Sequence, residues 1–473
     1  MFGFDHNQQK TLHLTWLAFF LTFFAWFNLT PFNSTLIFFL GFSEEQIKVL
    51  MVANVALTIP ARIFIGPLVD RFGPRIVFSI LLVFSALSCF IFAQSDSFFG
   101  VFVSRLLMGV SGAGFVVGIR MISEWFPERT MGIAQGIYGG LGVFGASGAM
   151  FLLPWVASFF DSGSGWRMAA NFSGILCLFW AFIYFWKAKD NLNRYSSSTA
   201  YETLRPSSNQ DKWLFTFLMA PAYAAMGAAA WKLSMPVSYD IESSWFFMIL
   251  CALAVGFIYH ILKFWNISIK LTSKSSMRNG QFRYLCILSV VYALTFGSEL
   301  AVISFFPQFL QNTFGLSVIQ AGMWGATFPL MNLITRPSGG WLSDVWGRKR
   351  TLAFLIFGAV ICYKFMGDID STWSLGAAIS VSVLCSIFLQ AGNGACFAIA
   401  PLVDKKAAGQ LAGIIGAYGN IGAVVFLIVF SFIDESSFFY MLSAFAVVVF
   451  FSLYFLSSFG KEEPLLVSKG INK

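Results

Sequence analysis

Charged side chains are scarce in this sequence. Asp, Glu, Lys and Arg make up 11% of its 473 residues, whereas a soluble domain contains about 25%. Hydrophobic residues make up 58%, and they form long runs, unlike the roughly ten-residue alternating segments of an outer-membrane barrel. A helix crosses the bilayer with about 20 apolar residues. We therefore predict an all-α polytopic membrane protein with little room for a soluble domain.

Residues that commonly hold metals, disulfides or nucleotides are also few. The sequence has three histidines and seven cysteines. The cysteines all fall inside apolar runs, and none forms a Cys-x-x-Cys motif, so we expect neither a disulfide nor a metal site. There is no Walker lysine motif and no soluble catalytic domain, which argues against an ATP-driven pump and against a membrane enzyme or sensor. We expect no cofactor.

The apolar runs fall into a group of six, a pair, and a second group of six. The first six lie at 12–36, 47–70, 75–94, 98–124, 130–157 and 166–187. A polar stretch at 188–212 precedes the pair at 213–234 and 244–266, and six more runs follow at 284–310, 317–345, 350–366, 373–402, 407–432 and 438–459. This predicts an N-terminal half (1–187), a loop with two inserted helices (188–282) and a C-terminal half (283–473), with about 14 spans in all.

The positions of the positively charged residues indicate the membrane topology. The formal net charge is +8, and the Lys and Arg residues gather in short loops that all fall on one side of the predicted membrane. Lys and Arg mark cytoplasmic loops, so we expect both termini in the cytoplasm, in the cell (inner) membrane, and no binding to nucleic acid. The N-terminus lacks the basic region and cleavage site of a signal peptide.

The two groups of six are copies of each other. Arg62 precedes Asp70 by eight residues, and Arg336 precedes Asp344 by the same number. A glycine ladder with a three-residue repeat also occurs once in each half. It comprises Gly136, Gly139, Gly142 and Gly145 in the first half and Gly413, Gly416, Gly419 and Gly422 in the second.

Such halves, and the twice-occurring Gly-x-Leu-x-Asp pattern around Asp70 and Asp344, resemble the major facilitator superfamily. That resemblance implies a substrate site near the middle of the membrane, between the halves. It also implies that both aspartates pair with arginines or helix N-termini and serve the switch between conformations. Arg105 with Gly109 resembles the fourth-helix Arg-x-x-x-Gly motif of the superfamily, which implies a gating role.

Arg62 and Arg336 are costly residues at their expected depth. An arginine at the centre of a membrane helix costs about 2.5–3.5 kcal/mol on insertion scales. Each lies about 12 Å from the aspartate of its half at 1.5 Å per residue, near the middle of a ~30 Å core. The pseudo-symmetry makes them face each other across a cavity, where a bound oxyanion suits the planar guanidinium. The alternative is that each pairs with a structural carboxylate, but few intramembrane carboxylates are available.

The glycine ladders have two possible explanations. Glycine every third or fourth residue allows two helix backbones to approach closely, which is packing alone. Close approach could also expose backbone N–H groups to a small anion. The sequence leaves both open.

Several segments resemble the nitrate/nitrite porters within the superfamily. They are Arg62, Arg336-Pro-x-Gly-Gly, Gly139-Gly-Leu-Gly-Val-Phe-Gly145, Gly416-Ala-Tyr-Gly-Asn-Ile-Gly422, Tyr292-Ala-Leu-Thr-Phe-Gly297 and Phe24-Ala-Trp-Phe27. The resemblance implies an anion site made by the two arginines, the glycine signatures and aromatic walls. On that basis the expected binding residues are Arg62, Arg336, Tyr292, Phe296, Asn420, Gly139, Gly142, Gly416, Gly419 and Trp26. The inserted helix pair is similar to that of a longer subgroup.

One position departs from the family. Val143 stands where the first signature usually has an asparagine, while Asn420 is retained in the second. The loss of one neutral hydrogen bond is worth about 0.5–1.5 kcal/mol, which weakens the case for strict nitrate selectivity.

Three further polar residues have alternative explanations. Arg120 and Glu124 have the i,i+4 spacing of a helical ion pair, which we favour over contact with the substrate. Glu299 is the candidate for proton coupling, because intramembrane acids often mark proton relays; otherwise it lies near the outer interface. Asn393 either lines the cavity or bridges helices.

The sequence therefore predicts a monomeric secondary transporter that carries nitrate or nitrite by alternating access. Transport of another small anion or organic metabolite on the same fold is the alternative. Whether protons or a counter-anion move with the substrate stays open. We expect the two inserted helices to be peripheral to the pathway, because their polar content is low.

Overall fold

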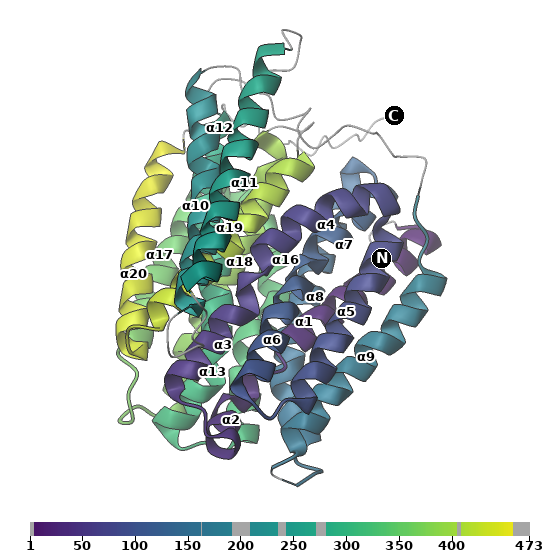
Figure 1. The fold of residues 1–473 in the computed structure, drawn as a ribbon. Coiled ribbons are helices and arrows are strands. Elements are labelled where there is room, and N and C mark those ends of the chain that lie inside the picture. Colours follow the sequence, from purple (N-terminus) through teal and green to yellow (C-terminus); the bar gives the residue numbers. More distant parts are fainter. Residues whose placement is uncertain are drawn as a thin grey trace, which may run out of the picture.

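The computed structural model describes residues 4–161, 163–191, 209–234, 243–270, 281–403 and 408–456. Within these ranges the chain is built from helices joined by short connections (Figure 1). The first half comprises α1 (His6–Trp26), η1 (Thr30–Phe32), α2 (Asn33–Leu40), α3 (Glu44–Ala56), α4 (Thr58–Phe72), α5 (Pro74–Gln94), α6 (Phe98–Met108), η2 (Gly109–Ala113), α7 (Gly114–Trp125), α8 (Glu128–Ala157) and α9 (Gly165–Lys187).

The inserted pair is α10 (Asn209–Leu233) and α11 (Ser243–Lys270). The second half comprises α12 (Gln281–Tyr292), the π-helical turn η4 (Ala293–Gly297), α13 (Ser298–Phe314), α14 (Val318–Gly325), α15 (Thr327–Leu330), α16 (Asn332–Trp346), α17 (Arg348–Gly367), α18 (Leu375–Val403), α19 (Ala408–Phe430), α20 (Glu435–Ser452) and η5 (Leu453–Phe455).

Among the described residues, 12 helical segments are long and apolar enough to cross a membrane. The expected spans at 47–70 and 317–345 are not among them. The first is broken at Leu57 between α3 and α4, and the second is divided into α14, α15 and α16, with Met331 before α16. Each break, at Leu57 and at Met331, comes five residues before the arginine of its half. The two arginines therefore lie in α4 and α16, the helices that follow the breaks. The total of about 14 spans stays a prediction.

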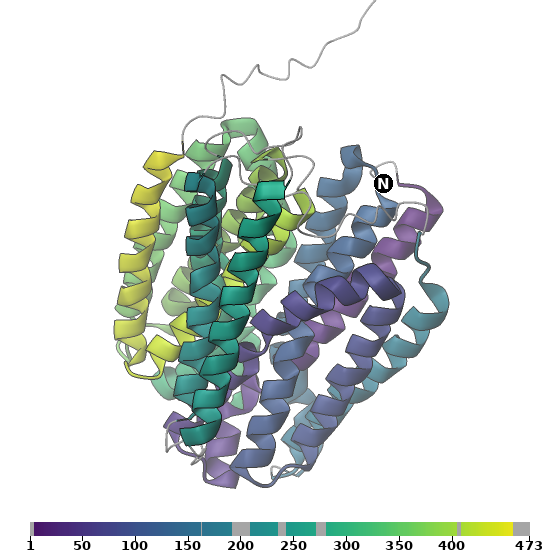
Figure 2. The same ribbon diagram turned by 45° about the horizontal axis from the view of Figure 1, so that its top comes forward.

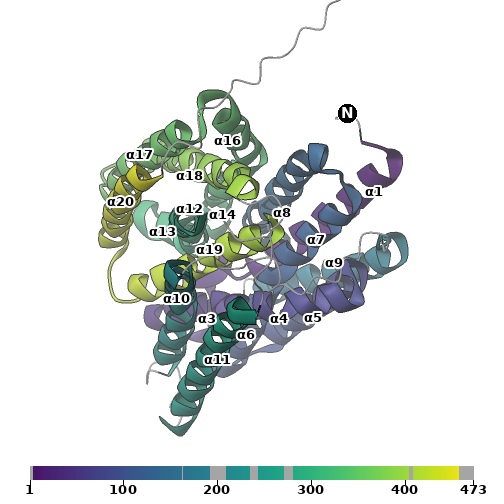
Figure 3. The ribbon, with the colours of Figure 1, turned by 90° about the horizontal axis from the view of Figure 1, so that it is seen from above.

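The two halves stand side by side, and helices of each half pack against the other. The purple-to-blue half and the green-to-yellow half lie next to each other in Figures 2 and 3. Helix α8 of the first half packs against α14, α15 and α16 of the second, and α19 of the second packs against α3 and α4 of the first. These are the helices that carry the glycine ladders. Each ladder is thereby brought next to the helix that bears the arginine of the opposite half.

Hydrogen bonds also join the halves away from the N-terminus. Asn33 Nδ2 donates to the Ser304 carbonyl at 3.1 Å, and Lys48 Nζ donates to the Ile433 carbonyl at 3.3 Å. Asn33 lies in α2 and Lys48 in α3, at the lower end of the bundle in Figure 1, whereas the N-terminus lies toward the upper end. These contacts hold the two halves together at that lower end.

The inserted helices differ in their packing. Helix α11 packs on α10 and lies on the outside of the bundle, as expected (Figure 3). Helix α10 packs against α12 and α19 of the second half and also against α3 of the first. The Tyr418 hydroxyl of α19 donates to the Leu218 carbonyl of α10 at 2.6 Å. Helix α10 is therefore packed against both halves, which low polarity alone does not reveal, and the expectation that the pair is peripheral to the pathway stays a prediction.

Candidate anion-binding site

Arg62 is buried in α4, and its hydrogen-bond partners among the described residues are backbone carbonyls. Its side chain is 7% exposed. Nη1 donates to the Gly416 carbonyl of α19 at 2.7 Å, and Nη2 donates to the Gly112 carbonyl of η2 at 3.2 Å. The guanidinium also lies over the Phe115 ring, 5.3 Å from its centroid. The charge of Arg62 thus reaches the opposite half, and no carboxylate in the described ranges pairs with it.

Arg336 occupies the matching place in α16. Its side chain is 6% exposed, Nη2 donates to the Tyr292 hydroxyl at 2.8 Å, and the guanidinium lies 5.7 Å from the centroid of the Phe296 ring. Nη1 is buried, and it has no hydrogen-bond partner in the part of the chain that the structure describes. The two guanidiniums interact electrostatically with each other. Two like charges in a low-dielectric interior repel each other, so their proximity favours an anion between them.

The glycine ladders make matched contacts in the two halves. A Cβ atom added to Gly139 would lie 3.8 Å from the Arg336 guanidinium carbon, and one added to Gly416 would lie 3.4 Å from Arg62 Nη1. The next glycine of each ladder receives aromatic rings: Gly142 receives Phe19, and Gly419 is packed against Tyr292 and Phe296. Gly139 and Gly416 thus leave space for the arginine of the opposite half. Gly142 and Gly419 leave space for aromatic rings.

The last glycine of each ladder lets two backbones touch. A Cβ atom at Gly145 would lie 2.0 Å from the Phe20 carbonyl oxygen of α1, and one at Gly422 would lie 2.4 Å from the Ala293 carbonyl oxygen of η4. Real Cβ atoms do not come that close, so only glycine permits these approaches. The ladders therefore pack α1 on α8 and η4 on α19, which supports the packing interpretation.

Aromatic rings connect the two arginines. Tyr292 stacks on Phe296 with centroids 5.1 Å apart, and Phe397 of α18 meets Tyr292 edge-on at 4.9 Å. Phe397 also contacts Phe115 at 5.9 Å, and Phe115 is stacked with Tyr138 of α8 at 6.4 Å. These ring contacts extend from Phe296, which lies against the Arg336 guanidinium, to Phe115, which lies against the Arg62 guanidinium. Rings of this kind exclude water and strengthen the electrostatic interactions inside the site.

Four aromatic residues of this wall were not singled out in the sequence. They are Phe19, Phe115, Tyr138 and Phe397. With 58 phenylalanines in the chain, composition does not distinguish them. Phe115 follows Gly112 and Gly114, and Phe397 follows Gly392 and Gly394. An aromatic residue after each of these small-residue pairs is the signal that could have found Phe115 and Phe397, and no such signal marks Phe19 or Tyr138.

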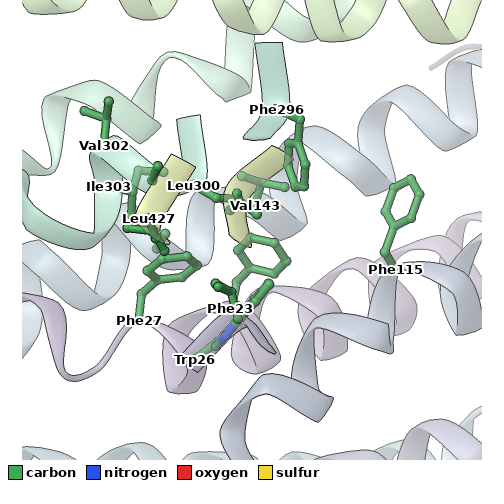
Figure 4. Packing of buried hydrophobic residues seen from close by; sticks show 14 of the residues in the cluster. Phe23, Trp26, Phe27, Phe115, Val143, Phe296, Leu300, Val302, Ile303 and Leu427 are labelled. Atoms are coloured by element: carbon green, nitrogen blue, oxygen red, sulfur yellow. The ribbon is translucent and has the colours of Figure 1, made fainter. Parts of the chain in front are cut away.

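Trp26 lies behind the site rather than in it. Its indole N–H donates to the Asn54 carbonyl at 2.6 Å, and its ring packs on Gly112, whose carbonyl accepts from Arg62. It is fully buried among Phe23 and Phe27 in the apolar cluster of Figure 4. Trp26 therefore supports the turn that holds Arg62, and Phe19 supplies the first-helix ring nearest to the ladder.

Asn420 and Val143 occupy unlike surroundings. Asn420 Nδ2 donates to the Gly416 carbonyl at 3.3 Å, the same carbonyl that accepts from Arg62, and its Oδ1 is buried without a partner. Val143 is 1% exposed and belongs to the buried apolar cluster that includes Phe23 and Leu300 (Figure 4). The valine therefore suits an apolar environment, and Asn420 is the carboxamide that lies beside Arg62 through their shared Gly416 carbonyl.

Two of the expected gating residues, Asp344 and Arg120, form ion pairs within their own segments. Asp344 is 3.9 Å from Arg348, and Arg120 is 3.3 Å from Glu124, each at i,i+4 spacing. These two pairs agree with the interpretation made from the sequence. The backbone of Asp70 lies in the last turn of α4, but its side chain lies outside the described residues.

Arg105 and Glu299 are both fully buried. Arg105 Nη1 donates to Asn28 Oδ1 at 2.7 Å, and its guanidinium lies 4.1 Å from the centroid of the Phe92 ring. Glu299 accepts hydrogen bonds from Asn332 and Asn393. The interfacial placement considered for Glu299 is therefore wrong, and Asn393 bridges α18 to α13.

Substituting Tyr292 with phenylalanine tests the support of Arg336. The ring should keep its stacking on Phe296, but Arg336 Nη2 loses its hydroxyl partner. The donor is charged, and a hydrogen bond to a charged group is worth about 1.5–3 kcal/mol, so we expect an about tenfold to hundredfold weaker affinity for the anion. Titration of the purified variant with nitrate measures this. Tyr184→Phe, at a buried tyrosine of α9, is the control and should keep the native affinity.

The comparisons with known proteins agree with this architecture. A family model described as Major Facilitator Superfamily matches residues 15–273 and 288–470. The xylose transporter XylE from E. coli, in a partially occluded inward-open conformation, superposes with a TM-score of 0.64 over 95% of this chain and 98% of its own. Its sequence is 13% identical, so it speaks for the fold alone. The fold and the family match define a multi-pass membrane transporter of the major facilitator type.

Curated relatives indicate which family of the superfamily this chain belongs to. The nitrate/nitrite transporter NrtP of Nostoc punctiforme is 42% identical over 98% of this chain and 94% of its own length. The protein of the same name from a Picosynechococcus species is 35% identical over 91% of this chain and 86% of its own. The chain belongs to the nitrate/nitrite porter family of the major facilitator superfamily.

Proposed function

We propose that this protein is a secondary transporter of nitrate or nitrite that works by alternating access and holds the anion between Arg62 and Arg336. The observation that carries the proposal is the pair of buried guanidiniums from opposite halves. Arg62 is bonded to two carbonyls and Arg336 to one hydroxyl. Neither forms an ion pair with a carboxylate in the described part of the chain. Relatives named as nitrate/nitrite transporters support the choice of substrate.

The chemistry of the site suits a small planar oxyanion. A guanidinium presents parallel N–H donors in a plane, which matches two oxygens of such an anion. Arg336 Nη1 is free to donate. Arg62 Nη1 is engaged with Gly416 across the halves, so an arriving anion would compete with that carbonyl. Exchange of a carbonyl for an anion at this point would couple binding to a movement of α19 against α4.

The proposed cycle uses the contacts between the halves. The anion enters between the two arginines, the halves rock about it, and the anion leaves on the other side. The hydrogen bonds of Asn33 and Lys48 would close one side of the pathway and must break when that side opens. We propose the cell membrane as the location, with both termini cytoplasmic, in agreement with the distribution of basic loops.

The test is an anion panel on the purified protein. A ligand that binds the folded state raises its apparent stability by mass action. We expect nitrate, nitrite or both to raise the melting temperature, and to exchange across the membrane of proteoliposomes, while chloride, sulfate and formate do neither. Stabilisation by another anion with silence from nitrate and nitrite would overturn the substrate assignment and leave the fold intact.

A further inference from the structure

The inserted helix α10 runs beside α19 and contacts it at two separate places (Figure 3). At the first, the Tyr418 hydroxyl of α19 donates to the Leu218 carbonyl of α10 at 2.6 Å. At the second, Lys232 Nζ of α10 lies 4.1 Å from the centroid of the Phe432 ring, and Trp231 stacks on the same ring with centroids 6.0 Å apart. Lys232 is 8% exposed, so contacts within the protein fix its position.

The two places are equally spaced along both segments. Leu218 and Lys232 are 14 residues apart, and so are Tyr418 and Phe432. This separation corresponds to about 21 Å, or about four helical turns. Phe432 lies just beyond α19, where its backbone N–H bonds the Val429 carbonyl and continues the turn. Helix α10 is therefore aligned with α19 in the same direction and in matching register.

Helix α19 benefits from such a support because it contains a glycine ladder at 413–422. Glycine is among the weakest helix formers, since its backbone loses the most freedom on folding. The ladder therefore makes α19 easier to bend. The neighbouring part of α10, between Pro221 and Lys232, contains six alanines, and alanine is the strongest helix former. A stiff helical segment thus lies along a weak one.

The loop after α19 makes a contact that joins the two halves at the lower end of the bundle. Lys48 Nζ of α3, in the first half, donates to the Ile433 carbonyl at 3.3 Å and lies 4.9 Å from the centroid of the Phe430 ring. A cation is favourable here, because the C-terminal end of a helix is the negative end of its dipole. Ile433 directly follows Phe432, so the contacts of α10 on that ring also place the carbonyl that receives Lys48.

Helix α10 also meets the first half directly at this end. It packs against α3. The charge of Lys232 interacts with Glu45 of α3, which attracts it, and with Lys48, which repels it. When the lower end opens, α3 must therefore separate from both α10 and α19.

The opposite end of the aligned segment lies at the proposed anion site. The Gly416 carbonyl accepts from Arg62 Nη1, and Tyr418 is two residues further along α19. An anion that takes the place of this carbonyl on Arg62 would displace α19 at Gly416. Because α10 is bonded to α19 at both ends of the weak segment, the displacement would reach the loop instead of being absorbed by bending.

We propose that α10 stiffens α19 and transmits the displacement caused by the anion at Gly416 to the Ile433 carbonyl, where it releases Lys48 and opens the lower end. Trp231 and Lys232 are the positioning residues of this device. The inference rests on the proposed anion site between Arg62 and Arg336. It gives α10 a place in the transport cycle: the helix moves with the second half.

The experiment measures the distance between two spin labels at the lower end of the whole chain in liposomes. The labels are attached through Asp161→Cys, in the exposed loop between α8 and α9, and Ser371→Cys, in the exposed loop between α17 and α18. Cys251→Ser and Cys286→Ser remove the described cysteines that are not buried. In the otherwise native protein, we expect nitrate to increase the population with the longer distance.

The test variant is Trp231→Leu/Lys232→Met, which removes both contacts on the Phe432 ring and keeps apolar bulk. We expect it to bind nitrate but to lose the nitrate-dependent change in distance. Without nitrate, its ratio of open to closed lower ends should rise about three- to tenfold, the effect of losing a cation–π contact. Lys232→Arg keeps a cation over the ring and should restore the native response. Lys364→Met is the control, since Lys364 lies 5.5 Å from the centroid of its neighbour Phe365 in α17; it should respond as the native protein does.

The outcomes separate the two proposals. A native change in distance in Trp231→Leu/Lys232→Met would overturn the role of α10, and so would native protein that binds nitrate without any change at the lower end. In both cases the anion site stands. If the double variant does not fold, Lys232→Met alone decides by the same measurement. If the native protein binds neither nitrate nor nitrite, the proposed function fails instead.

Discussion

Arg336→Lys should weaken nitrate binding by about tenfold to a hundredfold. A hydrogen bond to a charged group is worth about 1.5–3 kcal/mol, and each 1.4 kcal/mol is a factor of ten in affinity. Lysine keeps the charge but has a single compact donor group in place of the planar fork. It cannot bond Tyr292 and the anion in the same geometry. Titration of purified protein with nitrate measures the dissociation constant, and Arg62→Lys should show a loss of similar size.

A double-mutant cycle tests whether both arginines hold one anion. If they do, the loss in Arg62→Lys/Arg336→Lys should be smaller than the sum of the two single losses, because residues that share a partner are coupled. Additive losses would speak against a shared anion. Arg167→Lys is the control, since Arg167 is bonded to Asp96 at one end of α9, away from α4 and α16. It should bind nitrate as the native protein does.

Gly145→Ala should lower the melting temperature strongly and Gly136→Ala should hardly change it. Both glycines belong to the ladder of α8. The added Cβ at Gly145 would lie 2.0 Å from the Phe20 carbonyl oxygen, whereas Gly136 has nothing within 4 Å. Overpacking costs about 1–3 kcal/mol, and here the atom that must yield belongs to the backbone of α1. Thermal unfolding of the purified variants in detergent measures the difference.

The second half offers the same comparison. Gly422→Ala places its Cβ 2.4 Å from the Ala293 carbonyl oxygen of η4, and Gly413 again has nothing within 4 Å. We expect Gly422→Ala to be destabilised and Gly413→Ala to resemble the native protein. Equal shifts in melting temperature for the tight and the open position of each ladder would contradict the packing role. Folded Gly422→Ala protein should also show altered transport, because η4 carries Phe296.

The sequence was informative where the two halves repeat each other. The spacing from Arg62 to Asp70 and from Arg336 to Asp344 predicted two buried arginines, and the structure buries both. The glycine ladders predicted close helix contacts, which the structure shows at Gly145 and Gly422. A repeat is readable because a symmetric fold requires the same small or charged residue at equivalent places.

The sequence was weaker where a side chain's role depends on its direction. Trp26 was expected in the wall of the site, but it turns toward Asn54 of α3. Glu299 was left between the interface and the interior, and its burial depends on donors from α16 and α18. Hydropathy reports the average environment of a segment and does not reveal which of its faces meets protein.

By itself the sequence determined the membrane class, the two repeated halves and the arginine of each half, because scarce charge, long apolar runs and regular spacing are local properties of the chain. Only the tertiary structure decided the partners. It set the Arg62 guanidinium against the Gly416 carbonyl of the other half, Arg336 against Tyr292, and Glu299 against the side-chain amides of Asn332 and Asn393. These contacts join residues far apart in the chain. They form because helix breaks and glycine residues allow the helices to approach each other closely in the folded protein.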